Sequence, residues 1–143
     1  MIVNSEKPLR FEFVVPGDCV PWARAGGGKT GHRFTPPKQA KYMAALKLIC
    51  SAAMKGAKPL EGPVRIHLSA VYAWPKSVSA RKRREHVGSM WRTGRPDFDN
   101  IAKLVGDALN GVAWIDDAQI ASANVQKFYS DMPGLRVRIE ALG

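Results

Sequence analysis

Five aspartates lie in a short stretch, residues 95–120, of a chain that is otherwise rich in positive charge. Asp97 and Asp99 are one residue apart, and an adjacent pair, Asp116 and Asp117, follows after a short amphipathic segment. If Asp97, Asp99 and one member of the later pair come together, they form a set of three carboxylates without histidine or cysteine. Such a set suits a hard cation, so we expect Mg²⁺ or Mn²⁺ rather than zinc. Such sites hydrolyse phosphodiesters by activating water and holding the leaving oxygen. The stretch therefore predicts metal-dependent phosphodiester chemistry.

The spacing of these aspartates predicts that they meet in space. Residues two apart in extended backbone point the same way, so Asp97 and Asp99 should project together while Phe98 points inward as an anchor. Asp117 follows Asp99 by 18 residues, which allows a helix of about three turns and a short return. We expect Asp97, Asp99 and one member of the Asp116–Asp117 pair to form a single metal-holding cluster.

A purely structural role for the same residues is the alternative. Aspartate and asparagine are favoured at helix starts, so Asp99 or Asn100 would cap a helix and the later pair would form a turn. Lys103 lies one turn into that helix, either as a solvated lysine or as a cation that stabilises charge at a scissile phosphate. Asp107, four residues further on, is expected to pair with Lys103 or with a nearby backbone group.

The distribution of charge favours a nucleic-acid partner. The net charge is +10, and residues 76–96 carry seven basic and one acidic side chain, whereas residues 97–143 carry four and seven. A basic surface attracts a polyanion, and a divalent cation lets carboxylates lie beside phosphate. The candidate DNA contacts are Arg81, Lys82, Arg83 and Arg84, with Arg92, Arg95, Arg24, Arg33 and Lys29 as weaker ones. A solvated helix face is the alternative for residues 81–84, and Trp91 and Trp22 either stack on unpaired bases or pack internally.

The hydrophobic pattern places these residues in one α+β domain over residues 1–143, with residues 1–8 frayed. The predicted strands span residues 9–15, 64–74, 120–129 and 135–142, and the predicted helices run from residues 35–37 to Gly56, over 79–86 and over 100–110. Residues 20–35 and 87–96 are expected to be loops. The order β-α-β-α-α-β-β predicts one mixed sheet with helices packed on it, and the apolar strand over 64–74 is expected to be central.

Several other classes of protein fit the sequence poorly. Residues 23–30, ARAGGGKT, loosely match a phosphate-binding loop, but prolines on both sides leave no strand before it and no helix directly after it, so no nucleotide cofactor is expected. No apolar run of membrane-spanning length and no signal-peptide pattern is present, so no membrane partner is expected. Cys19 and Cys50, outside any CxxC pattern, are expected to be buried free thiols in a reducing cytoplasm.

Several blocks of the chain resemble a known signature. RPDFDN at 95–100, Lys103, DALNG at 107–111 and DDAQI at 116–120 resemble the signature of RusA-type Holliday junction resolvases, a family common in phages and prophages. Upstream, residues 16–17, 20–24 and 34–36 resemble the early loop of that family and the approach to its first helix. The resemblance covers most of the chain, and its specific part is the block from residue 95 to residue 120.

The resemblance implies a homodimer in the bacterial cytoplasm that binds four-way DNA junctions and makes paired, symmetric nicks with Mg²⁺ or Mn²⁺ during recombination and repair. It assigns the family's catalytic aspartates to Asp97, Asp99 and Asp117 and its essential lysine to Lys103. Where some members carry a basic residue before the first catalytic aspartate, this chain has Pro96, so Arg95 is expected to make that phosphate contact. A two-fold dimer agrees with symmetric cutting of a two-fold junction.

Two other functions remain open from the sequence. The first is a non-catalytic, basic DNA-binding module whose acids only cap a helix, which would bind DNA in a salt-sensitive way without nicking it. The second is a metal nuclease that acts on other branched DNA or on RNA. Comparing cleavage of junction, flap, duplex and RNA hybrid separates these functions.

Overall fold

The computed structural model describes residues 9–143 except 21, 23–25, 28–32, 35 and 88–89, and it has the predicted α+β architecture. The elements are β1 (Arg10–Pro16), β2 (Gly26–Gly27), β3 (Arg33–Phe34), α1 (Pro37–Met54), β4 (Val64–Tyr72), α2 (Ala80–Glu85), α3 (Phe98–Ala108), the 3-10 helix η1 (Asp117–Gln119), β5 (Ile120–Tyr129) and β6 (Gly134–Ala141). The predicted order of the larger elements is confirmed. The predicted loop over 20–35 was wrong where β2 and β3 pair, and much of the ARAGGGKT segment lies outside the described residues.

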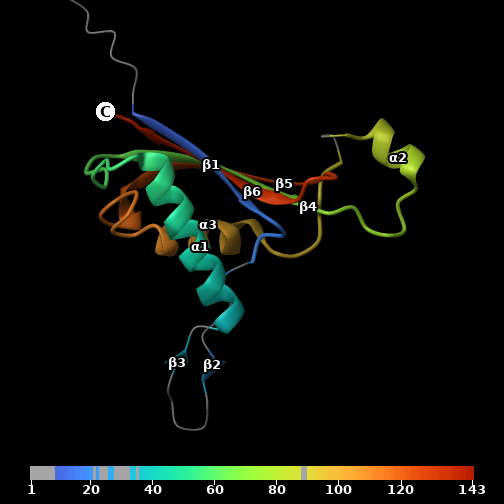
Figure 1. Cartoon of the computed structure of the whole chain (residues 1–143), viewed down its shortest axis with the longest axis horizontal. Helices are drawn as coiled ribbons and strands as arrows, with labels where there is room; N and C mark the ends of the chain where they lie inside the picture. Colours follow the sequence, from blue (N-terminus) through green and yellow to red (C-terminus); the bar gives the residue numbers. More distant parts are fainter. Residues whose placement is uncertain (1–8, 21, 23–25, 28–32, 35, 88–89) are drawn as a thin grey trace, which may run out of the picture.

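A four-stranded mixed sheet with the order β1-β6-β4-β5 forms the centre of the molecule (Figure 1). β6 is antiparallel to both β1 and β4, whereas β5 is parallel to β4. Parallel neighbours need a crossover connection, and here that crossover carries α2, α3 and η1. The predicted acidic stretch therefore lies on the connection between two adjacent strands, which brings its two ends to the same sheet.

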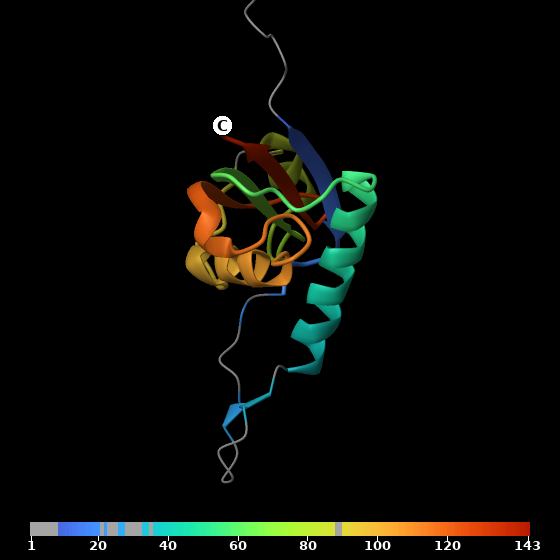
Figure 2. The same cartoon turned by 90° about the vertical axis from the view of Figure 1, so that its left-hand side faces the viewer.

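The core lies between the sheet and the two longer helices, α1 and α3, which cover the same face (Figures 1 and 2). β4 contributes alternate residues such as Ile66 and Leu68, and it is an interior strand, as predicted. α3 contributes a stripe at helical spacing, including Ile101 and Leu104, which are fully buried. Within the described chain, no helix combines the length and apolar character that crossing a bilayer requires.

Both cysteines lie in this core. Cys19 and Cys50 are buried and free, as the sequence predicted. Burial raises the pKa of each thiol to about 11, because the charged thiolate is disfavoured away from water. Neither thiol is therefore a reactive nucleophile at neutral pH.

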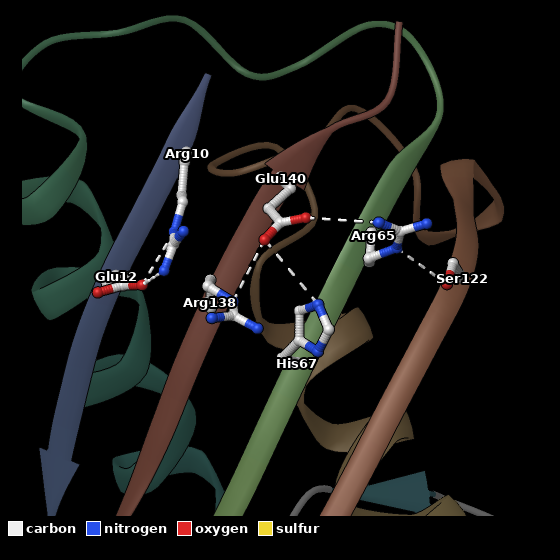
Figure 3. Close-up of polar contacts among 7 residues, drawn as sticks. All are labelled: Arg10, Glu12, Arg65, His67, Ser122, Arg138 and Glu140. Atoms are coloured by element: carbon white, nitrogen blue, oxygen red, sulfur yellow. Dashed lines mark hydrogen bonds and ion pairs between the residues drawn. The ribbon is translucent and has the colours of Figure 1, made fainter. Parts of the chain in front are cut away.

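The opposite face of the sheet carries a network of charged side chains rather than a helix layer (Figure 3). Glu140 on β6 lies 3.7 Å from Arg65, 3.9 Å from His67 and 3.3 Å from Arg138. Arg65 also donates to Ser122 at 3.3 Å on the neighbouring strand β5. Glu140 thus pairs with Arg65 and His67 across the strands and with Arg138 on its own strand, so one carboxylate faces three basic side chains.

Candidate active site

α3 begins directly after Asp97, which occupies the N-cap position with extended backbone, φ −68° and ψ 147°. Its side chain makes no capping hydrogen bond, although aspartate at this position usually does. Asp99 follows in the first turn of α3, and both side chains are exposed. The expectation that Asp99 or Asn100 is the cap was therefore wrong. Among the residues that the structure describes, neither carboxylate has a hydrogen-bond partner, and both lie at the positive end of the helix.

Phe98 lies between these two aspartates, and its predicted inward orientation was wrong. The side chain is 64% exposed. The prediction assumed extended backbone through Asp99, whereas α3 already begins at Phe98, so residues 98 and 99 have helical backbone. In a helix, residues three and four apart share a face, and Ile101 and Leu104 fill the side of α3 that faces the core.

Lys127 on β5 fixes the segment that leads into α3. Its Nζ donates to the carbonyl oxygens of Gly94 and Pro96 at 2.9 and 2.8 Å. Trp91 forms an antiparallel bridge with Phe128, so the start of the same segment pairs with β5 through its backbone. Both ends of the connection before Asp97 are thus attached to the sheet.

Arg92, predicted as a DNA contact, serves to hold this segment. Its Nε and Nη2 donate to the carbonyl oxygen of Arg95 at 2.8 and 2.6 Å. Its guanidinium lies 4.2 Å from the ring centroid of Tyr72 and 5.6 Å from that of Tyr129, within cation–π range. The side chain of Arg95 is exposed, and it remains a candidate for a phosphate contact.

A cavity of about 910 Å³ opens beside the start of α3. Its lining is both charged and aromatic, and it consists of Asp18, Cys19, Trp22, Tyr72, Ala73, Arg92, Arg95, Pro96, Asp97 and Asn100. The backbone N–H of Trp22 donates to the carbonyl oxygen of Asn100 at 3.3 Å, which joins the loop after β1 to α3. A cationic side chain, Arg95, and a free carboxylate, Asp97, therefore face one hollow.

Asp116 has a structural role at the second acidic pair. It is the N-cap of η1, and its carboxylate accepts a hydrogen bond from the N–H of Ala118 at 3.2 Å. The Oε1 of Gln119 accepts in return from the N–H of Asp116 at 2.9 Å, which completes a capping box. Gln119 also donates through Nε2 to the carbonyl oxygens of Leu60 and Gly62 at 2.7 and 3.0 Å. Gln119 thereby attaches the Asp116–Asp117 pair to the connection before β4.

Asp117, the first residue of η1, lies directly against α3 at Gly106. A Cβ at position 106 would lie 3.3 Å from the Cβ and 3.4 Å from the Oδ2 of Asp117, so glycine gives this carboxylate its place. Trp114 fixes the return of the chain, because its Nε1 donates to the carbonyl oxygen of Gly106 at 3.2 Å. Asp117 is therefore brought back to the same helix that begins with Asp97 and Asp99.

The predicted catalytic residues form a row along α3. Gly106 follows Asp99 by seven residues, or about 10 Å of helix, and Lys103 lies between them on the same face. Across the described part of the chain, no three acidic, histidine or cysteine side chains gather into a metal-holding group. The compact cluster expected from the sequence is thus absent from the structure, and Asp117 stands about two turns along α3 from Asp99.

The electrostatics of the row differ between its members. The pKa of Asp117 is raised because it shares a hydrogen bond with Asp116, with smaller effects of burial and of Asp107. The pKa of Asp116 is lowered, first by the N–H of Ala118 and then by Asp117. Asp107 thus interacts with Asp117, whereas no described ion pair joins it to Lys103 as the sequence suggested. Because a second negative charge lies near Asp117, a cation bound there would stabilise the ionised form of its carboxylate.

Lys103 lies beside an aromatic ring. Its Nζ is 5.0 Å from the ring centroid of Trp22, which is within cation–π range. The ammonium is otherwise exposed at the middle of the row. The ring limits the positions of a long, flexible side chain without neutralising its charge.

The basic run at 81–84 lies on α2, which projects from the end of β4 away from α1 and α3 (Figure 1). Arg83 is partly buried and donates to the carbonyl oxygens of Val78 and Pro75 at 3.1 and 3.3 Å. Arg81 pairs with Glu85 at 3.0 Å, whereas Lys82 and Arg84 are exposed. Two of the four predicted contacts thus have local structural partners. Arg24 lies outside the described residues.

Sequence reasoning overlooked three residues that build this site: Lys127, Gln119 and Gly106. A lone lysine or glutamine on a strand or turn gives no signal by itself. An isolated glycine inside a helical pattern does, because it costs about 1 kcal/mol relative to alanine and calls for a packing reason. Gly106 is such a glycine, and its reason is the approach of Asp117.

Comparison with known proteins relates the chain to a nuclease family and to a curated relative. A family model described as endodeoxyribonuclease RusA matches residues 16–140. A curated relative from Bacillus subtilis (strain 168), the uncharacterized protein YqaN, is 33% identical over 136 residues, which cover 90% of this chain and 94% of the relative. The residues matched by the family model include Asp97, Asp99, Lys103 and Asp117. They also include Gly106, Gln119 and Lys127, which help to position them.

Proposed function

The chain belongs to the RusA family of endodeoxyribonucleases, and from this premise we propose that it resolves Holliday junctions with a divalent metal ion. In this proposal a homodimer makes paired, symmetric nicks across a four-way junction during recombination and repair. The observation that carries it is the free carboxylate of Asp97. This aspartate lies at a helix start without a capping bond, Asp99 and Lys103 follow it on α3, and Asp117 of η1 packs against the same helix, so its carboxylate is available for chemistry.

Asp97 and Asp99 are the proposed direct ligands of Mg²⁺ or Mn²⁺, and Asp117, about two turns along α3 from Asp99, would reach the ion through water. Their donor set consists only of carboxylate oxygens, which fits a hard cation, and Mg²⁺ commonly retains several waters so that not every carboxylate binds it directly. When bound, such an ion activates water and neutralises charge on the leaving oxygen. The raised pKa of Asp117 agrees with a site where added positive charge is favourable.

The remaining residues of the site position the DNA and stabilise charge. Lys103, in the middle of the row, offsets the charge that develops at the phosphate during cleavage. Arg95 contacts the backbone beside Asp97, because both line the same cavity. Lys82 and Arg84 extend the contact along a DNA arm from α2. Phosphate contacts of this kind set position and carry no base sequence.

The test is cleavage of a synthetic four-way junction with and without Mg²⁺. The wild-type protein should nick opposite strands only with the metal, and Asp99→Asn should bind the junction without cutting it. Asp131→Asn, an exposed aspartate in the turn between β5 and β6, is the matched control and should cut normally. Sedimentation should give the mass of a dimer.

Each alternative has its own outcome in this assay. Undiminished cutting by Asp99→Asn would contradict the site assignment. Salt-sensitive binding without nicking under Mg²⁺ or Mn²⁺ would favour a non-catalytic DNA-binding module. Faster cleavage of a flap or an RNA hybrid than of the junction would favour a nuclease for other substrates.

A further inference from the structure

Phe98 is a large aromatic side chain on the surface, next to the proposed reaction. It is 64% exposed and lies between Asp97 and Asp99 at the first turn of α3. Trp91, at the other end of the segment before α3, is 63% exposed. Single exposed apolar side chains are common on soluble proteins, so the position of Phe98 between two proposed metal ligands, rather than its exposure alone, points to a contact with a partner.

The fold gives Phe98 no internal role. Ile101 and Leu104 already fill the side of α3 that faces the core, and both are fully buried. Phenylalanine is also a weaker helix former than alanine or leucine. Neither core packing nor helix formation therefore explains an aromatic residue here, whereas a contact from outside does.

The two aromatic residues are attached to a fixed segment. Trp91 meets Phe128 edge-on, with ring centroids 6.5 Å apart. Between Trp91 and Phe98, Lys127 binds the carbonyl oxygens of Gly94 and Pro96. A surface that is already ordered loses little conformational entropy when it binds a partner.

The chemistry of the surroundings identifies the partner as DNA bases. Arg95 is exposed on the same segment, and it lines the same cavity as Asp97. Aromatic side chains interleaved with basic ones are typical of surfaces that stack unpaired bases while holding the backbone. Base pairs at the branch point of a junction lack a continuous stack, so opening them costs little compared with duplex DNA.

We propose that Phe98 stacks on a base at the branch point, with Trp91 as a second contact, and thereby places the adjoining phosphate at Asp97 and Asp99. This inference rests on the proposed junction-resolving function. It makes Phe98 a positioning residue that selects branched over duplex DNA, because each base within a duplex is stacked on both sides whereas the stack is interrupted at a branch point.

The experiment uses a four-way junction with 2-aminopurine at the branch point and the full-length Asp99→Asn protein without metal, so that nothing is cut. Binding should raise the 2-aminopurine emission as the base leaves its stack. Adding Phe98→Ala should abolish that rise and weaken junction binding by roughly 5- to 150-fold, the range of one base–aromatic stack. Duplex affinity should not change, and Phe98→Trp should retain tight junction binding.

Leu48→Ala is the matched control, since Leu48 is a 73% exposed apolar residue on α1. It should bind the junction and raise the emission like its parent. Circular dichroism should show a folded Phe98→Ala protein, because the removed side chain is exposed and alanine favours helix.

Unchanged emission and affinity in Phe98→Ala would overturn the inference while leaving cleavage by the wild-type protein intact. A shift of Phe98→Ala from dimer to monomer on sedimentation would also overturn it, because Phe98 would then belong to a subunit contact. Failure of the wild-type protein to cut the junction would remove the proposed function, and this inference with it.

Discussion

Asp97 and Asp116 occupy the same position at two helix starts but have different surroundings. Both are N-cap residues with extended backbone, α3 following the first and η1 the second. Asp116 accepts a hydrogen bond from Ala118 and completes a capping box with Gln119, whereas Asp97 makes no capping bond. The short η1 depends on its cap, while the buried stripe of α3 holds that helix in place. Because core packing stabilises α3, the aspartate at its start is left available for chemistry.

The largest expected effect is the loss of cleavage in Asp97→Asn. Loss of a charged metal ligand removes several kcal/mol of transition-state stabilisation, or roughly 100- to 10,000-fold in rate. Because Asp97 makes no capping bond, the melting temperature should stay close to that of the wild-type protein. Single-turnover junction cleavage and thermal melts measure the two effects. A large drop in melting temperature would show that Asp97 supports α3 after all.

The next effect concerns the contact between Asp117 and α3. In Gly106→Ala, the new Cβ would lie 3.3 Å from the Cβ of Asp117, so the carboxylate must shift by a few tenths of an ångström. We expect cleavage to fall roughly 10- to 100-fold, because small misplacements of catalytic groups are costly. The gain in helix propensity, about 1 kcal/mol, should offset much of the strain in a thermal melt.

Gly62→Ala is the matched control for this substitution. Gly62 has no heavy atom within 4 Å of its Cβ position, and its backbone is not in the left-handed region. Cleavage should be unchanged in this variant. Equal cleavage by Gly106→Ala would show that the position of Asp117 against α3 does not matter for the reaction.

A smaller effect is expected on the melting temperature, and it should distinguish the capping role of Asp116 from the catalytic role proposed for Asp97. Asp116→Ala loses the cap of η1 and should lower the melting temperature by about 2–4 °C. Asp116→Asn should restore it, because asparagine caps as well as aspartate does. Asp116→Asn should still cut the junction, whereas Asp97→Asn should not. This difference would show that Asp116 serves as a cap and Asp97 acts in the reaction. Loss of cleavage in Asp116→Asn with a normal melting temperature would instead give Asp116 a chemical role.

The smallest effect is a pH-dependent change in stability from the adjacent pair. The folded state raises the pKa of Asp117 above its ordinary value of 3.8, so folding favours its protonated form and ionisation weakens the fold as pH rises through the folded pKa. Asp117→Asn should therefore melt slightly higher than the wild-type protein at pH 7, without metal. The difference should vanish below pH 3.8, where both forms are neutral. A lower melting temperature at pH 7 would show that the charge of Asp117 is satisfied in the fold.

The sequence alone determined the order of the elements, the interior position of β4 and the buried stripe of α3. Local periodicity carries this information, since alternate residues of a strand and every third or fourth residue of a helix share a face. The sequence also indicated the family, through Asp97, Asp99, Lys103 and Asp117. It missed where α3 begins, and with it the exposure of Phe98, because one residue of extended or helical backbone changes the side to which a side chain points.

Only the tertiary structure decided which acid caps and which stays free. Gln119 reaches a carbonyl oxygen 59 residues away, at Leu60, and Lys127 reaches Gly94 over 33 residues, and such pairings depend on the path of the whole chain. The same holds for Arg92 and Arg83, whose guanidinium groups hold backbone carbonyls instead of facing outward. Donors and acceptors are general chemical groups, so residue type shows that a bond can form, whereas the fold decides with which partner.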